Sequence, residues 1–273
     1  CAGGVFGNVK PNQHIMELPE IDEIFVYPAM SDAGLAAGAA LMPFLTRGRT
    51  DTLKTTRLND VYLGPGFTNH EVRKILDKSG YKYKHLLEGE RAQTIAKLVA
   101  DGKIVGLFQG RMEYGPRALG NRTILANPTD PKINDWLNQR LSRSEFMPFA
   151  PSVLEERCPE IFENYAKGAY TAKFMTVTYL VKEPWRSKIG AVVHVDGTAR
   201  PQAVSRADNP RYYDILKEYE KITGLPVILN TSFNVHEEPI ICRPEEALRA
   251  LEEKRVDLLI VEDFLVYPEK DSN

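Results

Sequence analysis

Residues 103–123 read KIVGLFQGRMEYGPRALGNRT, and this stretch predicts a strand together with the loop that the strand carries. The apolar run 103–108 is typical of a buried strand. The four glycines of the stretch allow positive φ angles and close approach of the backbone to a ligand. Its three arginines offer planar charged groups that suit phosphate or carboxylate. The residues indicate an oxyanion-binding loop, although a turn with a solvated basic rim has the same composition.

The composition is that of an ordinary globular protein. The chain has 273 residues, of which 43% are hydrophobic, and this length suggests about two domains. A net charge of -2 gives no overall attraction to nucleic acid, so an anion site must be local. The apolar stretch 33–45 is shorter than the ~20 residues of a membrane span. Three widely spaced cysteines fit a reduced, cytoplasmic compartment. We therefore expect neither a nucleic-acid nor a membrane partner.

Alternating helix and strand patterns predict a mixed α/β fold. Residues 46–60 contain few apolar side chains and predict a linker, with a domain boundary near residue 60. Helices are expected over 8–18, 69–79 (capped by Asn69), 88–101, 131–141, 210–223 and 244–254, and from residue 32 onward. Strands are expected over 23–27, 81–85, 103–108, 226–229 and 257–261, with extended runs over 174–180 and 190–195.

Two further polar clusters follow apolar runs: HVDGTARPQ at 194–202 and NTSFN at 230–234. Open α/β sheets bind ligands at strand ends, so we expect both clusters and the 109–123 loop to line one crevice. Together they would offer one anion backbone N–H groups and the side chains of Arg117, Arg122, Arg200, Thr231 and Ser232. Taken singly, Ser232 also fits a turn residue, and His194 fits a half-buried histidine with satisfied hydrogen bonds.

Several familiar catalytic motifs are missing from the sequence. It contains no P-loop, no GxSxG elbow and no HExxH metal motif. Asp32 stands alone at an expected helix start, where it fits either an N-cap or a metal ligand.

Four motifs, in this order, closely resemble the C-terminal part of the NodU/CmcH family of O-carbamoyltransferases. They are QGRMEYGPRALGNR at 109–122, PFAPSV at 148–153, HVDGTARPQ at 194–202 and LNTSFN at 229–234. AGGVFGN at 2–8 and AMSDAG at 29–34 fit as well. The resemblance covers essentially the whole chain.

The resemblance implies two unequal parts. Residues 1–59 would be the C-terminal remnant of a Kae1-like domain of the actin/hexokinase type, with its linker. Residues 60–273 would form a YrdC-like domain, a twisted mixed sheet with flanking helices. In the family, the YrdC-like domain uses carbamoyl phosphate and ATP to make carbamoyl-adenylate. The Kae1-like domain passes the carbamoyl group to a hydroxyl of a small-molecule acceptor, such as an antibiotic, a sugar or a nodulation factor.

The resemblance also implies cofactors and residue roles. ATP with Mg²⁺ is expected, and a metal ion, with iron as a candidate, in the complete Kae1-like domain. Arg117 would hold carbamoyl phosphate and form the catalytic set with Arg200 and Ser232. Further substrate contacts would come from Arg111, Arg122, Arg143, His194, Thr231 and Asn234. Gly3, Gly4 and Asn230 would contact the nucleotide, and Asp32 would bind metal.

The sequence departs from the family in two ways. Many members carry a lysine and an arginine just before PFAP, where this chain has LSR at 141–143 and then Met147. Arg140 or Arg143 would have to supply the missing charge. The family's N-terminal region, with its metal-binding histidines and acceptor pocket, is not in this sequence, so we expect the chain alone not to complete a transfer. We also expect Ile24, Val26 and the Ala/Leu helix to expose an apolar surface that pairs with a second copy.

Two alternatives remain open. A threonylcarbamoyl-adenylate synthase-like tRNA-modification protein would share the fold, but such proteins display a basic face that the balanced charge here does not indicate. A non-catalytic nucleotide-binding domain is the other alternative.

Overall fold

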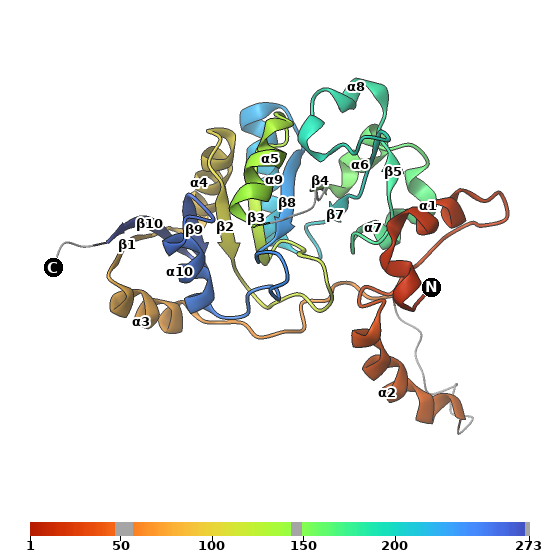
Figure 1. The fold of residues 1–273 in the computed structure, drawn as a ribbon, viewed down its shortest axis with the longest axis horizontal. Helices are drawn as coiled ribbons and strands as arrows, with labels where there is room; N and C mark the ends of the chain where they lie inside the picture. Colours follow the sequence, from red (N-terminus) through yellow and green to blue (C-terminus); the bar gives the residue numbers. More distant parts are fainter. Residues whose placement is uncertain (47–56, 143–148, 271–273) are drawn as a thin grey trace.

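Strand β2 (Val105–Phe108) lies in the middle of an eight-stranded mixed sheet. The computed structural model describes residues 1–46, 57–142 and 149–270, and within them the strand order is β1-β10-β9-β2-β3-β8-β4-β7 (Figure 1). The other strands are β1 (Tyr81–His85), β3 (Arg122–Ala126), β4 (Ala150–Leu154), β7 (Gln202–Val204), β8 (Val227–Ser232), β9 (Leu258–Val261) and β10 (Phe264–Lys270). The β2–β9 and β4–β7 pairs are parallel and the others antiparallel. The predicted mixed α/β class is confirmed.

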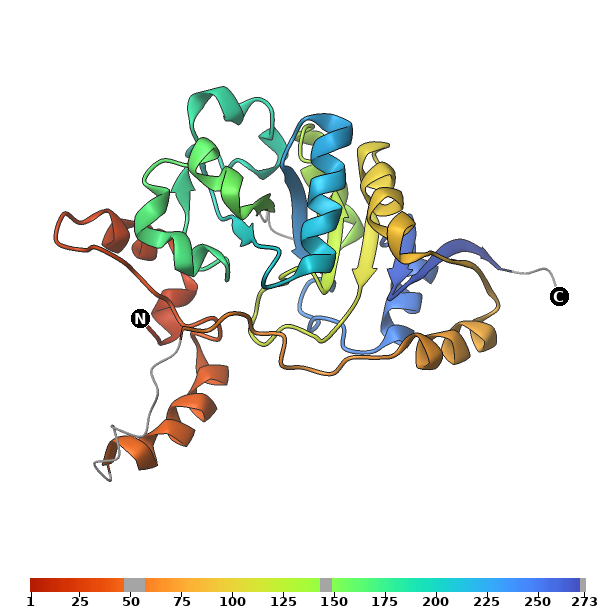
Figure 2. The ribbon, with the colours of Figure 1, turned by 180° about the vertical axis from the view of Figure 1, so that it is seen from behind.

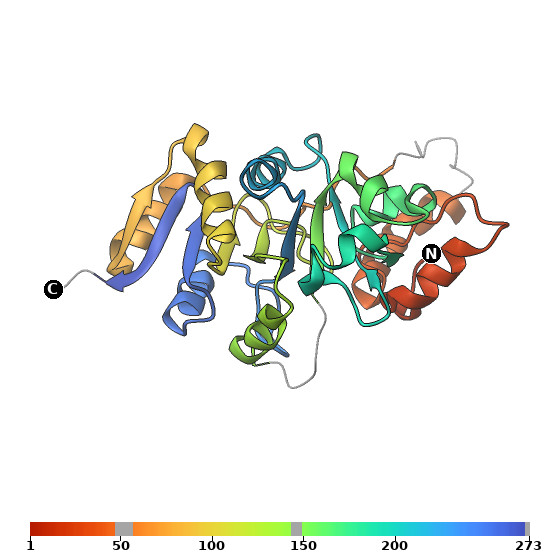
Figure 3. The same ribbon diagram turned by 90° about the horizontal axis from the view of Figure 1, so that it is seen from above.

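Helices cover both faces of the sheet, so β2 is buried on both sides and its sequence is apolar throughout. Helices α4 (Glu88–Ala100) and α9 (Pro210–Thr223) pack over Val105 and Leu107. Phe108 belongs to the cluster on the other face. That cluster includes side chains of α3 (Asn69–Ser79), α5 (Lys132–Arg140) and α10 (Pro244–Glu252). Figure 3 shows α4 and α9 on one side of the sheet and α5 and α10 on the other.

The N-terminal segment lies against a region of short elements beside the sheet. This region contains α6 (Cys158–Ile161), α7 (Ala169–Ala172), α8 (Glu183–Arg186) and the two-stranded sheet β5 (Tyr179–Leu180) and β6 (Thr198–Ala199). Helix α1 (Val9–Glu17) makes two buried contacts with it: Asn12 Nδ2 donates to the Thr176 carbonyl at 2.7 Å, and Thr178 Oγ1 donates to Gln13 Oε1 at 2.8 Å.

Helix α2 (Leu35–Thr46) projects away from the rest of the chain (Figures 1 and 2). Its five large apolar side chains, Leu35, Leu41, Met42, Phe44 and Leu45, are 42–69% exposed. The predicted exposed apolar surface is therefore confirmed for this helix. Among the described residues, no helix has the length and apolar character needed to cross a membrane.

The same prediction is wrong for Ile24 and Val26, which are 4% and 0% exposed. The backbone N–H of Ile24 donates to the Lys167 carbonyl and that of Val26 to Thr171 Oγ1. Residues 23–27 do not form the expected strand, because a 3₁₀ turn (Tyr165–Gly168) and a threonine side chain satisfy these donors instead of a neighbouring strand.

Most other predicted elements are present, and the exceptions have local causes. Helix α3 is capped by Thr68 in a capping box with Glu71, not by Asn69. The expected extended run 190–195 begins with a 3₁₀ turn over Gly190–Val192. In the run 174–180, only Tyr179–Leu180 pairs as a strand.

Gly120 provides a test of the packing beside the 109–123 loop. It has a φ of +101°, and an added Cβ would lie 2.3 Å from a ring carbon of the buried Tyr212. Gly80 also has a positive φ, +71°, but its Cβ would meet nothing within 4 Å. Both Gly→Ala changes destabilise the fold, because alanine is strained at a positive φ. Only Gly120→Ala also brings its Cβ into a clash with Tyr212. We expect Gly120→Ala to lose about 1–3 kcal/mol more unfolding free energy in urea than Gly80→Ala. Equal losses would contradict this packing.

Candidate functional site

Three segments far apart in the sequence line one pocket. Arg117 comes from the loop between β2 and β3, Arg200 from the turn between β6 and β7, and Thr231 and Ser232 from the end of β8. The remaining lining residues are Pro116, Ala118, Phe149, Ala150, Met175 and Asn230. The structure therefore brings the three predicted catalytic residues together.

Arg117 holds a desolvated positive charge in this pocket. Its Nη2 donates to the Gly7 carbonyl at 3.2 Å, and its Nε is buried without a hydrogen-bond partner. Burial lowers the pKa of Arg117. Within the described parts of the chain, no ion pair with a carboxylate compensates for this burial. A buried cation without a counter-charge favours an anionic ligand.

The end of β8 is organised by Asn230, which is 1% exposed. Its Nδ2 lies within hydrogen-bond distance of the Ala118 carbonyl, Ser152 Oγ and Gln202 Oε1, at 3.0–3.1 Å. This network joins the arginine loop, which is the loop between β2 and β3 that carries Arg117, to strands β4 and β7. Asn230 therefore supports the pocket wall. At the rim, Ser232 Oγ donates to Asn234 Oδ1 at 2.6 Å. Asn234 Nδ2 in turn donates to the Glu238 carbonyl, which fixes the Asn234 amide next to the pocket.

Two predicted anion contacts do not line this pocket. Arg122 is fully buried, stacks on Phe108 and donates to backbone carbonyls, among them that of Gln109 at 2.8 Å. Arg111 is exposed and donates to the Leu63 and Gly64 carbonyls. Both side chains hold backbone segments in place, although the Nε of Arg122 is buried without a hydrogen-bond partner.

The substitute charge expected before PFAP is not supplied by Arg140. Its Nη1 pairs with Asp257 Oδ1 at 2.8 Å, and its guanidinium stacks 3.4 Å from the Trp136 ring centroid. Arg143 and Met147 lie outside the described residues.

His194 is close to the pocket but does not line it. Its Nδ1 lies 3.2 Å from Thr198 Oγ1. Burial, and then the positive charge of Arg200, lowers the pKa of His194 to about 4. The imidazole is therefore neutral at pH 7, so His194 adds no positive charge there.

The other predicted residues gather at a separate groove. Gly3, Gly4 and Asp32 line it together with residues of α2. Ser31 occupies the N-cap position of the 3₁₀ turn Asp32–Gly34, so Asp32 is not its cap. The described residues include no group of three or more His, Cys, Asp or Glu side chains that could hold a metal ion. Asp32 is a single carboxylate, so the described residues do not complete a metal site by themselves.

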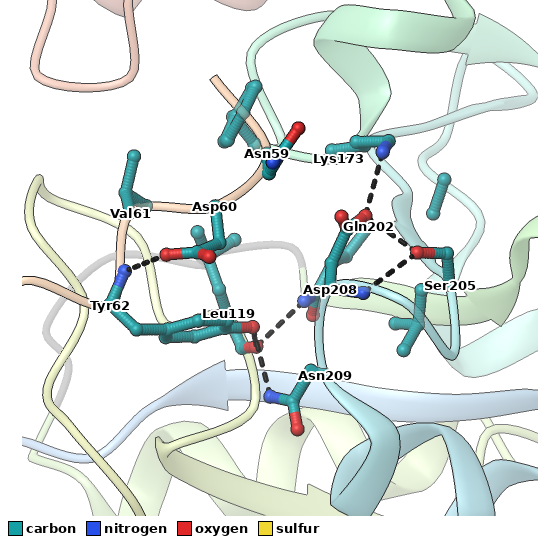
Figure 4. A pocket seen from close by; sticks show the side chains of 13 residues that line it. Asn59, Asp60, Val61, Tyr62, Leu119, Lys173, Gln202, Ser205, Asp208 and Asn209 are labelled. Carbon is teal, nitrogen blue, oxygen red and sulfur yellow. Dashed lines mark hydrogen bonds and ion pairs between the residues drawn. The ribbon is translucent and has the colours of Figure 1, made fainter. Parts of the chain in front are cut away.

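A second pocket is lined by Leu119 of the arginine loop (Figure 4). Its volume of about 20 Å³ leaves room for about one water molecule. Its polar groups bond to one another: Lys173 Nζ pairs with Asp208 Oδ2 at 2.7 Å, and Tyr62 OH and Gln202 Nε2 both donate to the Leu119 carbonyl. These contacts fix Leu119, two residues after Arg117.

The sequence interpretation missed Glu113, a 5% exposed carboxylate inside the arginine loop. Its Oε1 accepts the backbone N–H groups of Leu119, Asn121 and Arg122 at 2.7, 2.7 and 3.1 Å. One available signal was a lone acidic residue among glycines and arginines, where a side-chain acceptor can satisfy backbone donors that form no ladder.

Comparison with known proteins gives the class of this chain. The profile of the carbamoyltransferase C-terminus matches residues 96–267, which include Arg117, Arg200 and Ser232. The profile of the carbamoyltransferase N-terminus matches residues 1–41. The chain belongs to the carbamoyltransferase family, which confirms the resemblance seen in its motifs.

Individual relatives are longer than this chain. An uncharacterized protein of Methanocaldococcus jannaschii is 41% identical over 97% of this chain and 43% of its own length. Nodulation protein NolO of Bradyrhizobium diazoefficiens is 41% identical over 97% of this chain and 48% of its own length. The chain thus spans less than half the length of these two relatives. A crystal structure of full-length HypF in the phosphate- and nucleotide-bound form matches 64% of this chain and 25% of its own, with a TM-score of 0.45 and 20% identity.

The depressed pKa of His194 predicts a pH dependence of stability. Between about pH 4 and 6.5 the unfolded chain binds a proton at this residue that the folded chain does not. The free energy of unfolding should therefore fall as the pH is lowered through this range, and His194→Gln should weaken the dependence. NMR titration should give a His194 midpoint near 4. A midpoint near 6.5 would contradict the described environment.

Proposed function

We propose that this chain is the adenylate-forming part of an O-carbamoyltransferase. Residues 60–273 would form a YrdC-like domain that uses carbamoyl phosphate and ATP, with Mg²⁺, to make carbamoyl-adenylate. Residues 1–59 would belong to a Kae1-like domain that passes the carbamoyl group to a hydroxyl of a small-molecule acceptor. Family membership supports the carbamoyl chemistry, and the similarity to nodulation protein NolO suits the nodulation-factor type of acceptor that the motif resemblance implies.

The observation that carries the proposal is the buried charge of Arg117, which lies in one pocket with Arg200 and Ser232. Carbamoyl phosphate is an anion with a planar carbamoyl head that needs both donors and acceptors. Two guanidinium groups can neutralise its phosphate, while hydroxyl and amide side chains suit the head. The reaction requires positioning and charge neutralisation more than a protein nucleophile.

The proposed reaction consumes one water molecule. Water breaks the bond between the carbamoyl group and phosphate, which releases phosphate and carbamate. A carbamate oxygen then displaces pyrophosphate from ATP. Asp32, Gly3 and Gly4 lie in a different groove, outside the pocket that contains Arg117.

Arg117→Ala should reduce carbamoyl-phosphate-dependent formation of the AMP adduct at least about a hundredfold, because the anion loses its buried counter-charge. Arg249→Ala removes the same charge from an exposed position on α10 and should retain activity. The rate of adduct formation would be measured from the pyrophosphate that the same step releases. Full activity in Arg117→Ala would contradict the proposal, and adduct formation with bicarbonate plus threonine instead of carbamoyl phosphate would favour a threonylcarbamoyl-adenylate synthase.

We further propose that a second copy of the chain covers the apolar side chains of α2. A charged substitution there should disrupt this pairing, because it would bury an unpaired carboxylate. Sedimentation equilibrium should give a dimer for the chain and a monomer for Leu41→Glu. A monomer for both would contradict self-association through α2.

A further inference from the structure

The loop that carries Arg117 is closed on itself by a buried carboxylate. Glu113 Oε1 accepts the N–H of Leu119 at 2.7 Å, so residues 113–119 form a short ring of backbone and side chain. The same oxygen also accepts the N–H groups of Asn121 and Arg122, where β3 begins. Arg117 lies inside the closed segment.

Both backbone polar groups of Leu119, its N–H and its carbonyl, are hydrogen-bonded. Its N–H donates to Glu113 Oε1. Its carbonyl accepts hydrogen bonds from Tyr62 OH at 2.8 Å and from Gln202 Nε2 at 2.7 Å (Figure 4). Gln202 lies on β7 and is 3% exposed. The loop is therefore fixed to the sheet at a point two residues from Arg117.

The outer side of the loop rests on the N-terminal segment. Tyr114 OH donates to the Ala33 carbonyl at 2.6 Å, and Arg117 Nη2 donates to the Gly7 carbonyl. Each of these two side chains makes one hydrogen bond to the N-terminal segment. Glu113 Oε1, in contrast, accepts three buried hydrogen bonds. The carboxylate is the stronger constraint, because hydrogen bonds to a charged acceptor in a buried site exceed neutral ones.

We propose that Glu113 is the positioning residue for Arg117, setting the place of its guanidinium in the pocket without touching the substrate. This proposal rests on the proposed function, because it takes carbamoyl phosphate as the anion that Arg117 binds. Glu113→Gln keeps the side-chain shape but replaces the charged acceptor and puts an NH₂ group where Oε2 is buried without a partner. The loop should then loosen and Arg117 should leave its bound position.

The test compares the affinity for carbamoyl phosphate, measured by calorimetry at a temperature where every variant is folded. Glu113→Gln should bind at least tenfold more weakly than the unchanged chain. Val99→Ala is the control: it opens a cavity in the fully buried core under α4, away from the loop. It should lower the melting temperature and leave the affinity unchanged. If Glu113→Gln does not fold, Glu113→Asp, which draws the carboxylate back by one methylene, should show the same weakening.

The outcomes separate the two proposals. Binding by the unchanged chain that is lost in Arg117→Ala, together with affinity in the Glu113 variant within twofold of Val99→Ala, would overturn the positioning role alone. No binding of carbamoyl phosphate by the unchanged chain would overturn the proposed function and the positioning role with it.

Discussion

The backbone of Leu119 is the point at which the sheet controls the candidate site. Its N–H is held by the Glu113 carboxylate and its carbonyl by Gln202 on β7, so the loop between β2 and β3 cannot move independently of the sheet. Asn230 on β8 adds a bond to the neighbouring Ala118 carbonyl. A flexible glycine-rich loop thereby gains a fixed shape, which is the condition for electrostatic preorganisation.

The site combines this rigidity with burial of positive charge. Arg117 is desolvated, and burial together with the positive charge of Arg200 lowers the pKa of His194, so His194 is neutral where the two arginines are charged. Burial of the Arg117 charge without a counter-charge costs free energy, and the proposed anionic ligand would reduce this cost. Polar side chains at the pocket wall, such as Asn230, are mostly bonded to the protein. The proposed recognition of an anion therefore relies on few groups, each held in place by the protein.

Local sequence patterns predicted much of the fold and part of the site. Helix α9 has the predicted bounds, 210–223, because its proline, asparagine cap and apolar face all lie within one segment. Strand β4 was missed because it contains Pro151, and a proline inside an apolar run argues against a paired strand. The meeting of Arg117, Arg200 and Ser232 followed from their places at strand ends. The inward orientation of Arg122 and the role of Glu113 depend on backbone groups that local patterns do not describe.

The central claim is that Arg117 and Arg200 bind the phosphate of carbamoyl phosphate in one pocket. A crystal structure of the chain with a non-hydrolysable carbamoyl phosphate analogue tests it most directly. The account predicts phosphate oxygens within hydrogen-bond distance of both guanidinium groups, with Ser232 beside the ligand. Density for the analogue elsewhere, with the pocket between Arg117 and Ser232 free of it, would contradict the account.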